Sequence, residues 1–366
     1  MEKLNNIQIC TCNIFSENVI IAGGSGGSSD VKRKVEDKKD EFSSELLKIF
    51  IRKNKLSSIT SILIPGIPKQ CNGSVGLFSA NYIGKLVVGS QNRLYQYKPS
   101  AREWSELPST YKNRHGASSC CIGSKKILVC GGERHGDTAE IFHLDYFDRA
   151  SIIQPASLAY WTKFQKNEAE RLAIPSTVMD DDESIPHWGC PSKLPIKVSY
   201  HTMIKLPDGR VMLIGGCRRD GSPSDKVFIG HLTIDETDVK WNEIGTLNRP
   251  RFKHIAFQLK GTIFVAGGIG RQGKPYIGCE RYDVHTNQWI TTSYDMPYPL
   301  SEASVVVGKD QNYAIVIGGR ITNKNDIHVS RISSKVLVFT EENGFLENNS
   351  FALRTERYGH VSLMAN

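Results

Sequence analysis

Arginine recurs in the short connections between strand-like segments of this chain. Its planar guanidinium can donate paired hydrogen bonds to the two oxygens of a carboxylate or to a phosphate. One set of connections, each following a glycine-ended segment, carries Arg134, Arg218, Arg219, Arg271 and Arg320. A second set, which precedes the next segment of the same kind, carries Arg114, Arg251 and Arg357. If folding brings both sets to one face, we expect that face to bind an acidic group.

The elements that must position these arginines form an internal repeat. An apolar run that ends in two glycines occurs at residues 19–24, 127–132, 211–216, 263–268 and 314–319. A degenerate copy at residues 86–90 has lost one glycine. Runs of four to seven apolar residues bounded by turn residues indicate strands. A glycine pair at the end of such a run indicates a crowded turn in which a β-carbon would not fit.

The surroundings of the glycine pairs also repeat. A strand that often begins with Arg and contains His precedes the pair, as at residues 114–117, 251–254 and 357–360. A strand with an acidic or tyrosyl signature follows it, most clearly at residues 279–283, and then comes a Trp such as Trp104, Trp241 or Trp289. This order predicts four antiparallel strands per repeat, with the Trp filling the gap between neighbouring sheets. Sheets arranged radially cover one another's faces and protect their edges.

These residues resemble the Kelch repeat, which has a glycine pair after an apolar strand, then a Tyr-Asp-like strand, then a Trp. The resemblance covers most of the chain and implies an all-β fold, a six-bladed β-propeller of four-stranded antiparallel Kelch blades. We expect residues 1–366 to form this single domain. The predicted blades are residues 17–64 closed by 357–366, then 75–107, 114–165, 198–244, 251–292 and 302–349.

Two insertions and the chain ends complicate this assignment. Residues 25–44 are Gly/Ser-rich and then mixed in charge, and residues 146–196 contain Trp161, Trp188 and several prolines. We expect the first to be a solvated loop and the second an irregular segment, with Trp161 a candidate for the outer strand of the third blade. Residues 357–366 are expected to complete the first blade, although residues 7–12 could take that place instead. In that case the chain could be a fragment of a longer propeller.

Composition excludes several function classes. The chain has 46 Lys and Arg against 38 Asp and Glu, a net charge of +8 spread along 366 residues, whereas nucleic-acid binding usually shows a concentrated basic stripe. No apolar stretch is long enough to span a membrane, and the N-terminus lacks the long apolar region of a signal peptide. We therefore expect a cytoplasmic protein without membrane or nucleic-acid partners. The nine cysteines lack paired metal-ligand spacing and are interpreted as buried thiols.

Strands that alternate in direction place the connections between the second and third strands on the same face as the connections between blades. In Kelch-type substrate adaptors, this face binds an acidic or carboxylate-bearing peptide, and the arginine pattern agrees with that implication. The candidate partner-binding residues are Arg134, Arg218, Arg219, Arg271, Arg320, Arg114, Arg251, Arg357 and Tyr200. For Arg114, Arg251 and Arg357, stabilisation of a blade edge is an equal alternative. Tyr276, Ser199 and Ser301 are further rim candidates.

An enzymatic interpretation is the main alternative. The pair Tyr200-His201 resembles a copper-ligating strand of galactose-oxidase-type propellers. Such a site also needs a second His, a second Tyr and a crosslinked Cys, which we cannot place, and no loop matches the iron-binding set of related specifier proteins. His115, His201, His254 and His360 recur at one position of the repeat, which favours a structural role near the channel over a metal ring.

The sequence thus predicts a protein that is not an enzyme and has no cofactor or bound metal. Its expected function is a protein–protein interaction module or scaffold for an acidic or carboxylate-bearing segment, used as a ubiquitin-ligase substrate adaptor or as a cytoskeletal, actin-binding protein. Only about 16 residues precede the first glycine-ended strand, so an adaptor role would need a separate dimerisation partner. The partner's identity and the oligomeric state are not predicted. The alternative is a galactose-oxidase-like copper enzyme, or another small-molecule enzyme, that uses the central channel.

Overall fold

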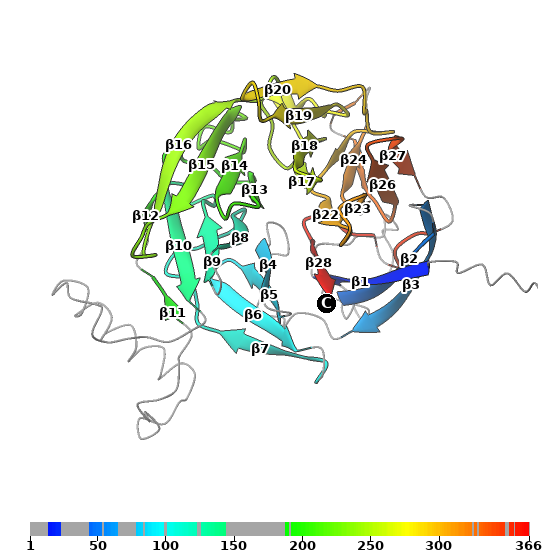
Figure 1. Cartoon of the computed structure of the whole chain (residues 1–366), viewed down its shortest axis with the longest axis horizontal. Coiled ribbons are helices and arrows are strands. Elements are labelled where there is room, and N and C mark those ends of the chain that lie inside the picture. The colour runs from blue at the N-terminus through cyan, green and yellow to red at the C-terminus, as the bar shows by residue number, and fades with distance from the viewer. Residues whose placement is uncertain are drawn as a thin grey trace, which may run out of the picture.

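The repeated runs form sheets that stand side by side in a ring (Figure 1). The computed structural model describes residues 14–22, 44–52, 55–64, 78–82, 85–98, 101–122, 126–143, 187–189, 192–323, 326–327, 329–347, 351–354 and 356–365. Statements about the structure concern these residues. None of their helices is long and apolar enough to cross a membrane.

The first three sheets are antiparallel, and we call them blades one to three. Blade one has the order β28 (Val361–Ala365), β1 (Ile14–Ala22), β2 (Ser44–Arg52) and β3 (Lys55–Ile64). Blade two consists of β4 (Phe78–Tyr82), β5 (Lys85–Ser90), β6 (Arg93–Lys98) and β7 (Glu103–Leu107). Blade three consists of β8 (Ser118–Ile122), β9 (Lys126–Cys130), β10 (Thr138–His143) and β11 (His187–Trp188), and β12 (Ser192–Lys193) also pairs with β10.

Blades four to six repeat the same order. Blade four contains β13 (Thr202–Lys205), β14 (Val211–Ile214), β15 (Lys226–Leu232) and β16 (Val239–Thr246). Blade five contains β17 (Ile255–Leu259), β18 (Thr262–Ala266), β19 (Cys279–Asp283) and β20 (Gln288–Thr291). Blade six contains β22 (Ser304–Val307), β23 (Ala314–Ile317), β26 (Val336–Thr340) and β27 (Gly344–Glu347).

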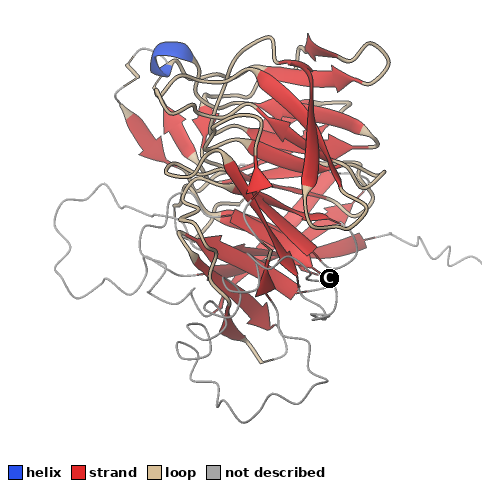
Figure 2. Ribbon diagram, turned by 90° about the vertical axis from the view of Figure 1, so that its left-hand side faces the viewer, coloured by secondary structure: helices blue, strands red, loops and turns tan. Residues whose placement is uncertain are grey.

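Two small elements lie outside these blades. A three-stranded sheet has the order β21 (Leu300–Ser301), β24 (Arg320–Thr322) and β25 (Ser330–Ile332). The short 3-10 helix η2 (Arg271–Gly273) projects at the edge of the strands in Figure 2. The predicted all-β propeller of four-stranded antiparallel blades is confirmed. The described residues contain six four-stranded antiparallel paths.

The two ends of the described chain meet in blade one. The last strand, β28, lies antiparallel to β1 with Asn18 opposite Ala365, and Figure 1 shows the red and blue strands together. Blade one therefore contains strands from both ends of the sequence, and each end holds the other in the ring. Residues 7–12, the alternative for this strand, lie outside the described residues, as do residues 25–43 and most of the insertion at 146–196.

The outer strand of blade three differs from the expectation. The sequence placed the end of this blade at residue 165, with Trp161 as the candidate Trp. In the structure the fourth strand is β11, where Trp188 lies opposite Phe142. The Trp188 ring is buried with its centre 4.8 Å from that of the Phe142 ring, and its Nε1 donates to the Pro108 carbonyl at 2.7 Å. Trp161 lies outside the described residues.

The core lies between blades as well as within them. Met212 and Ile214 of blade four pack in one cluster with Val265, Tyr282 and Trp289 of blade five. Trp289 therefore fills the space between neighbouring sheets as predicted, and each blade is stabilised by burying its face against the next one. Among the described cysteines, Cys120, Cys130 and Cys279 are buried free thiols, which confirms their predicted role, whereas Cys121 and Cys217 are partly exposed.

Candidate functional site

The connections that carry the arginines lie on one face, which we call the loop face. It comprises the connections between the second and third strands of each blade and the connections between blades. In blade four, an isolated bridge joins Ser199, before the first strand, to Cys217, after the glycine pair. In blade five, Phe252 and Ile269 form the same bridge. The two sets of connections therefore meet, as the alternation of strand direction required.

The glycine pairs allow this close meeting. Gly215 has a φ of +61°, and a β-carbon there would lie 2.7 Å from the Arg251 carbonyl oxygen. The following glycine, Gly216, donates its N–H to that same carbonyl at 2.9 Å. A side chain would push the next blade away, so the glycine pair fixes the distance between blades.

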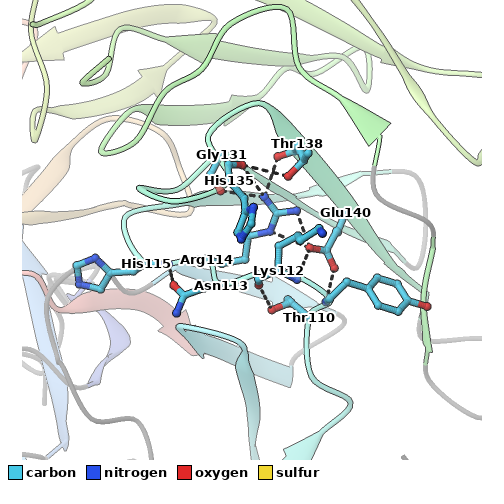
Figure 3. A network of polar contacts seen from close by, with 10 residues as sticks. Thr110, Lys112, Asn113, Arg114, His115, Gly131, His135, Thr138 and Glu140 are labelled. Atoms are coloured by element: carbon cyan, nitrogen blue, oxygen red, sulfur yellow. Dashed lines mark hydrogen bonds and ion pairs between the residues drawn. The ribbon is translucent and has the colours of Figure 1, made fainter. Parts of the chain in front are cut away.

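Arg114 and Arg251 are buried and do not face a partner. Both side chains are 0% exposed, and the Nη2 of each lies 2.5 Å from a buried carboxylate, Glu140 and Glu280 respectively. Figure 3 shows Arg114 reaching Glu140 while His115 points the other way. The remaining guanidinium donors bind backbone carbonyls, including those of Gly131 and Gly267 at 2.9 and 3.0 Å.

Each buried glutamate also accepts from the connection that leads into its blade. Glu140 accepts the N–H groups of Tyr111 and Lys112, and Glu280 accepts those of Asn248 and Arg249. The Arg–Glu pair thus holds the blade entry, the glycine pair and the third strand together. The alternative of a blade-stabilising role is correct for Arg114 and Arg251, because an enclosed side chain cannot reach a ligand. Arg357, 2% exposed, is likewise too buried for a partner-facing role.

The histidines of the first strands occupy the space that the glycines leave. The Cε1 atoms of His201, His254 and His360 lie within 3.0 Å of the positions that β-carbons on Gly131, Gly215 and Gly318 would take. Burial lowers the pKa of His201 and that of His360 to about 3 each, and lowers the pKa of His254 well below its usual value. His201, His254 and His360 therefore have the structural role in packing that the sequence predicted. Within the described ranges, no group of three or more His, Cys, Asp or Glu side chains could hold a metal ion.

A backbone belt runs around the mouth of the channel from blade to blade. The N–H groups of Tyr200, Lys253, Glu302 and Gly359 each donate to the equivalent residue of the preceding blade, at 2.6 to 3.0 Å. The first acceptor is Gly116, and all five residues have φ between +51° and +71°. Three of them are not glycine, although this conformation costs side-chain-bearing residues about 1 kcal/mol. The belt therefore aims the side chains of Tyr200, Lys253 and Glu302 at the mouth.

These side chains form a continuous polar network. The Tyr200 hydroxyl donates to Glu133 at 2.6 Å, and the His115 Nδ1 lies 3.1 Å from the same carboxylate. Burial and the Glu133 contact raise the pKa of the Tyr200 hydroxyl. Lys253 lies over the Tyr200 ring and pairs with Glu302. The carboxylates at the mouth are thus already paired.

Arg320 belongs to this network. Its Nε is 3.7 Å from the Glu302 carboxylate, and its guanidinium carbon lies 4.0 Å from the centre of the Tyr358 ring. The Arg320 Nη1 also donates to the Ser330 hydroxyl at 3.2 Å. Three contacts therefore hold this arginine, and it is less available to a partner than the sequence suggested. Ser199 and Ser301, the other rim candidates, are buried.

Four of the predicted residues do come together, in a cleft of about 550 Å³ between blades three and four. Arg134 and Tyr200 line it with Arg218 and Arg219, which project from a tight turn. In that turn, the Arg218 N–H donates to the Ser222 carbonyl at 2.8 Å, and Gly221 donates back to Arg218 at 3.0 Å. The turn thus holds the backbone that carries both arginines at the cleft.

The charges in the cleft are not balanced. Lys197 pairs with Asp137 at 2.9 Å, and Glu133 is occupied by His115 and Tyr200. Among the described residues, Arg218 forms one ion pair, a 3.7 Å contact to Asp225. Arg134 and Arg219 are exposed and form no ion pair or side-chain hydrogen bond with another described residue. The cleft therefore offers guanidinium groups whose N–H donors could bind an anion.

Arg271 lies on the equivalent turn of the next blade. The bridges Cys217–Pro223 and Ile269–Pro275 place Arg219 and Arg271 at matching positions of blades four and five. Arg271 is exposed and does not line the cleft. Tyr276, the remaining rim candidate, stacks instead beneath Arg249 and Arg251, whose guanidinium carbons lie 5.7 and 5.3 Å from its ring centre.

Comparisons with known proteins agree with this fold. No protein-family model matches the chain. The chain is similar to Kelch repeat and BTB domain-containing protein 12 of Danio rerio, with 30% identity over 50% of this chain and 32% of that protein. It is 28% identical to Kelch-like protein 41b of Danio rerio over 55% of this chain and 35% of that one, and 27% identical to alpha-scruin of Limulus polyphemus over 36% and 14%. The matched part of this chain spans about a third of the length of the first two relatives.

Among solved structures, the chain is similar to that described as the structure of YjhT. The TM-score is 0.55 at 15% sequence identity, and the match covers 90% of this chain and 97% of that one. At this identity the likeness concerns the fold alone. The relatives and the fold thus agree with the repeat read from the sequence.

Proposed function

Because this chain is a Kelch-repeat β-propeller, at modest identity to its relatives, we propose that it is a non-catalytic interaction module for an acidic or carboxylate-bearing segment of another protein. The segment binds on the loop face, at the cleft between blades three and four. The observation that carries the proposal is the convergence of Arg134, Arg218 and Arg219 there without strong ion pairs among the described residues. Tyr200 contributes a ring wall beside them.

The chemistry of the cleft supports a carboxylate over a cation. The two acidic groups that line it are already engaged with His115, Tyr200 and Lys197. An arginine–carboxylate contact at a partly buried site contributes about 1.5–3 kcal/mol. Two such contacts supply about 3–6 kcal/mol of the roughly 8 kcal/mol that micromolar binding requires, so further contacts must supply the rest.

The test is the affinity of synthetic acidic peptides, measured by fluorescence anisotropy. The double variant Arg218→Glu/Arg219→Glu is expected to weaken binding about a hundredfold or more, because two charge-assisted contacts become repulsions. The matched control is Lys240→Glu/Arg281→Glu, which makes the same charge change on strands β16 and β19. Equal affinities of the double variant and the wild type would refute the proposal, provided that both have the same far-UV spectrum.

Two cellular uses follow from this binding activity. One is a substrate adaptor, which presents the bound segment to a ligase complex, and the other is a cytoskeletal role. Co-sedimentation with actin filaments separates them: pelleting that Arg218→Glu/Arg219→Glu abolishes supports the cytoskeletal use. An enzymatic use of the channel predicts instead a stoichiometric metal in the purified protein, and finding copper or iron at one per chain would overturn the proposal.

A further inference from the structure

Blade six carries a longer connection on the loop face than blades four and five. In blades four and five, the connection after the glycine pair closes as a tight turn, at residues 217–223 and 269–275 respectively. In blade six it forms the hairpin of β24 and β25, which pairs with β21 at the blade entry. Strands β21, β24 and β25 therefore form a small sheet on the loop face, separate from the four strands of blade six. We call β24, β25 and the described residues between them (323, 326–327 and 329) the blade-six hairpin.

The hairpin is anchored at its root. At the root, Ile321 is buried in the core cluster shared by blades five and six. The strand pairing continues beyond the strands, because the Asn323 N–H donates to the Val329 carbonyl at 2.8 Å and the Val329 N–H donates to Asp326 at 3.1 Å. These two hydrogen bonds join the described residues on either side of the hairpin.

The tip exposes two branched apolar side chains. Ile327 is 42% exposed and Val329 is 53% exposed, and the two lie two residues apart in the sequence. The other exposed large apolar residues of the described chain are scattered singly on outer strands and their turns: Ile234, Val284, Ile290 and Leu346. Single exposed apolar residues are ordinary, but a pair on one hairpin of the loop face offers a contact for another apolar group.

Cations adjoin this apolar tip. The Ile327 Cδ1 lies 3.6 Å from the position that a β-carbon on Gly273 would take, so the hairpin of blade six touches helix η2 of blade five. On and beside that helix, Arg271 and Lys274 are exposed and form no ion pair with another described residue. An apolar contact and two unpaired positive charges therefore share one edge of the loop face.

We infer that the blade-six hairpin and helix η2 form a second contact area, which takes a hydrophobic side chain flanked by acidic residues in the bound protein segment. The inference rests on the proposed function and adds a requirement to it. Arg271 and Lys274 attract the acidic residues, and Ile327 and Val329 cover the hydrophobic side chain. Partial burial of one leucine against these two residues corresponds to about a tenfold gain in affinity.

The test uses pairs of synthetic acidic peptides that differ only in one position, Leu or Ser, with that position moved along the peptide. The wild type is expected to bind the best Leu peptide about tenfold more tightly than its Ser twin. The variant Ile327→Ser/Val329→Ser is expected to lose this preference and to keep its affinity for the Ser peptides. The control Ile234→Ser/Val284→Ser, altered at exposed apolar residues of outer turns, is expected to keep the preference.

The outcomes separate this inference from the proposed function. If Ser peptides bind and the wild type shows no preference for Leu, or the preference survives in Ile327→Ser/Val329→Ser, the second contact area is refuted while acidic-peptide binding stands. If no acidic peptide binds, both fail. Sedimentation velocity tests whether a second copy of this chain occupies the contact area instead. A dimer that Ile327→Ser/Val329→Ser abolishes would show that it does, and would overturn the inference.

Discussion

The three buried histidines, His201, His254 and His360, make the stability of the ring depend on pH. Neutral imidazole fits between the glycine pair of one blade and the first strand of the next, whereas imidazolium would be a buried charge. Neither ring nitrogen of His201 has a hydrogen-bond partner among the described residues, while the Nε2 atoms of His254 and His360 lie within hydrogen-bond distance of the Thr202 and Ser304 hydroxyls. We therefore expect protonation to be coupled to unfolding.

The sign and size of the effect follow from the depressed pKa values. In the unfolded chain a histidine titrates near pH 6.5, whereas burial holds the pKa of His201 and that of His360 at about 3. The stabilisation is complete above pH 6.5 and is lost as the pH falls toward 3, because only the unfolded chain takes up the proton. Between pH 7 and pH 5 each of these two histidines costs about 2 kcal/mol, hence roughly 4 kcal/mol together. Protonation of His254, whose pKa burial also lowers, adds to this loss. The loss is a large part of the roughly 5–15 kcal/mol that stabilises an ordinary domain.

Urea unfolding at pH 7, 6.5, 6, 5.5 and 5 measures this dependence. His201→Gln is expected to lower the slope of the unfolding free energy below pH 6 by about 1.4 kcal/mol per pH unit, the contribution of one proton. The matched control is His285→Gln, at an exposed turn residue whose loss should leave the slope unchanged. If His201→Gln retains the full wild-type slope, the imidazole takes up protons in the folded state and the reasoning is wrong.

Three further predictions follow from the site. Glu280→Ala should lower the unfolding free energy by about 3–5 kcal/mol, because the buried Arg251 loses its carboxylate; Glu243→Ala, which breaks only the exposed pair with Lys226, should cost under about 1 kcal/mol in the same denaturation experiment. Gly215→Ala should cost about 3 kcal/mol, because a β-carbon would meet the Arg251 carbonyl, whereas Gly209→Ala, with open space around it, should cost about 1 kcal/mol, and equal thermal shifts would contradict this. Acidic-peptide affinity should fall steadily as NaCl rises from 50 to 500 mM, and an affinity independent of salt would contradict a guanidinium–carboxylate contact.

The sequence was informative where a feature repeats and is local. The glycine pairs, the Trp of the outer strands and the histidine position each recur with fixed neighbours, and Gly215, Trp289 and His254 have the packing roles that this repetition indicated. The blade-three Trp was missed because a long insertion separates β10 from β11. Nothing in the sequence within that insertion distinguishes Trp188 from Trp161 before the pairing with Phe142 is seen.

The roles of the arginines depended on contacts distant in sequence. Arg114 and Arg251 meet Glu140 and Glu280, 26 and 29 residues further along the chain. The acidic signature of the third strand was visible, and pairing it with the Arg of the blade entry would have revealed the clamp. No comparable signal marks Arg320, which lies over the ring of Tyr358 in the segment that leads into the last strand, β28. The cleft likewise exists only because blades three and four face each other.

A charge-swap binding experiment tests the central claim most directly. Matched peptides, one rich in Glu and one with Lys at the same positions, are titrated into the wild type and into Arg218→Glu/Arg219→Glu under the same buffer. The account predicts that the wild type prefers the Glu peptide, and that the variant reverses this order and binds the Lys peptide more tightly. An unchanged preference for the Glu peptide in the folded variant would show that the arginines of this cleft do not recognise the partner.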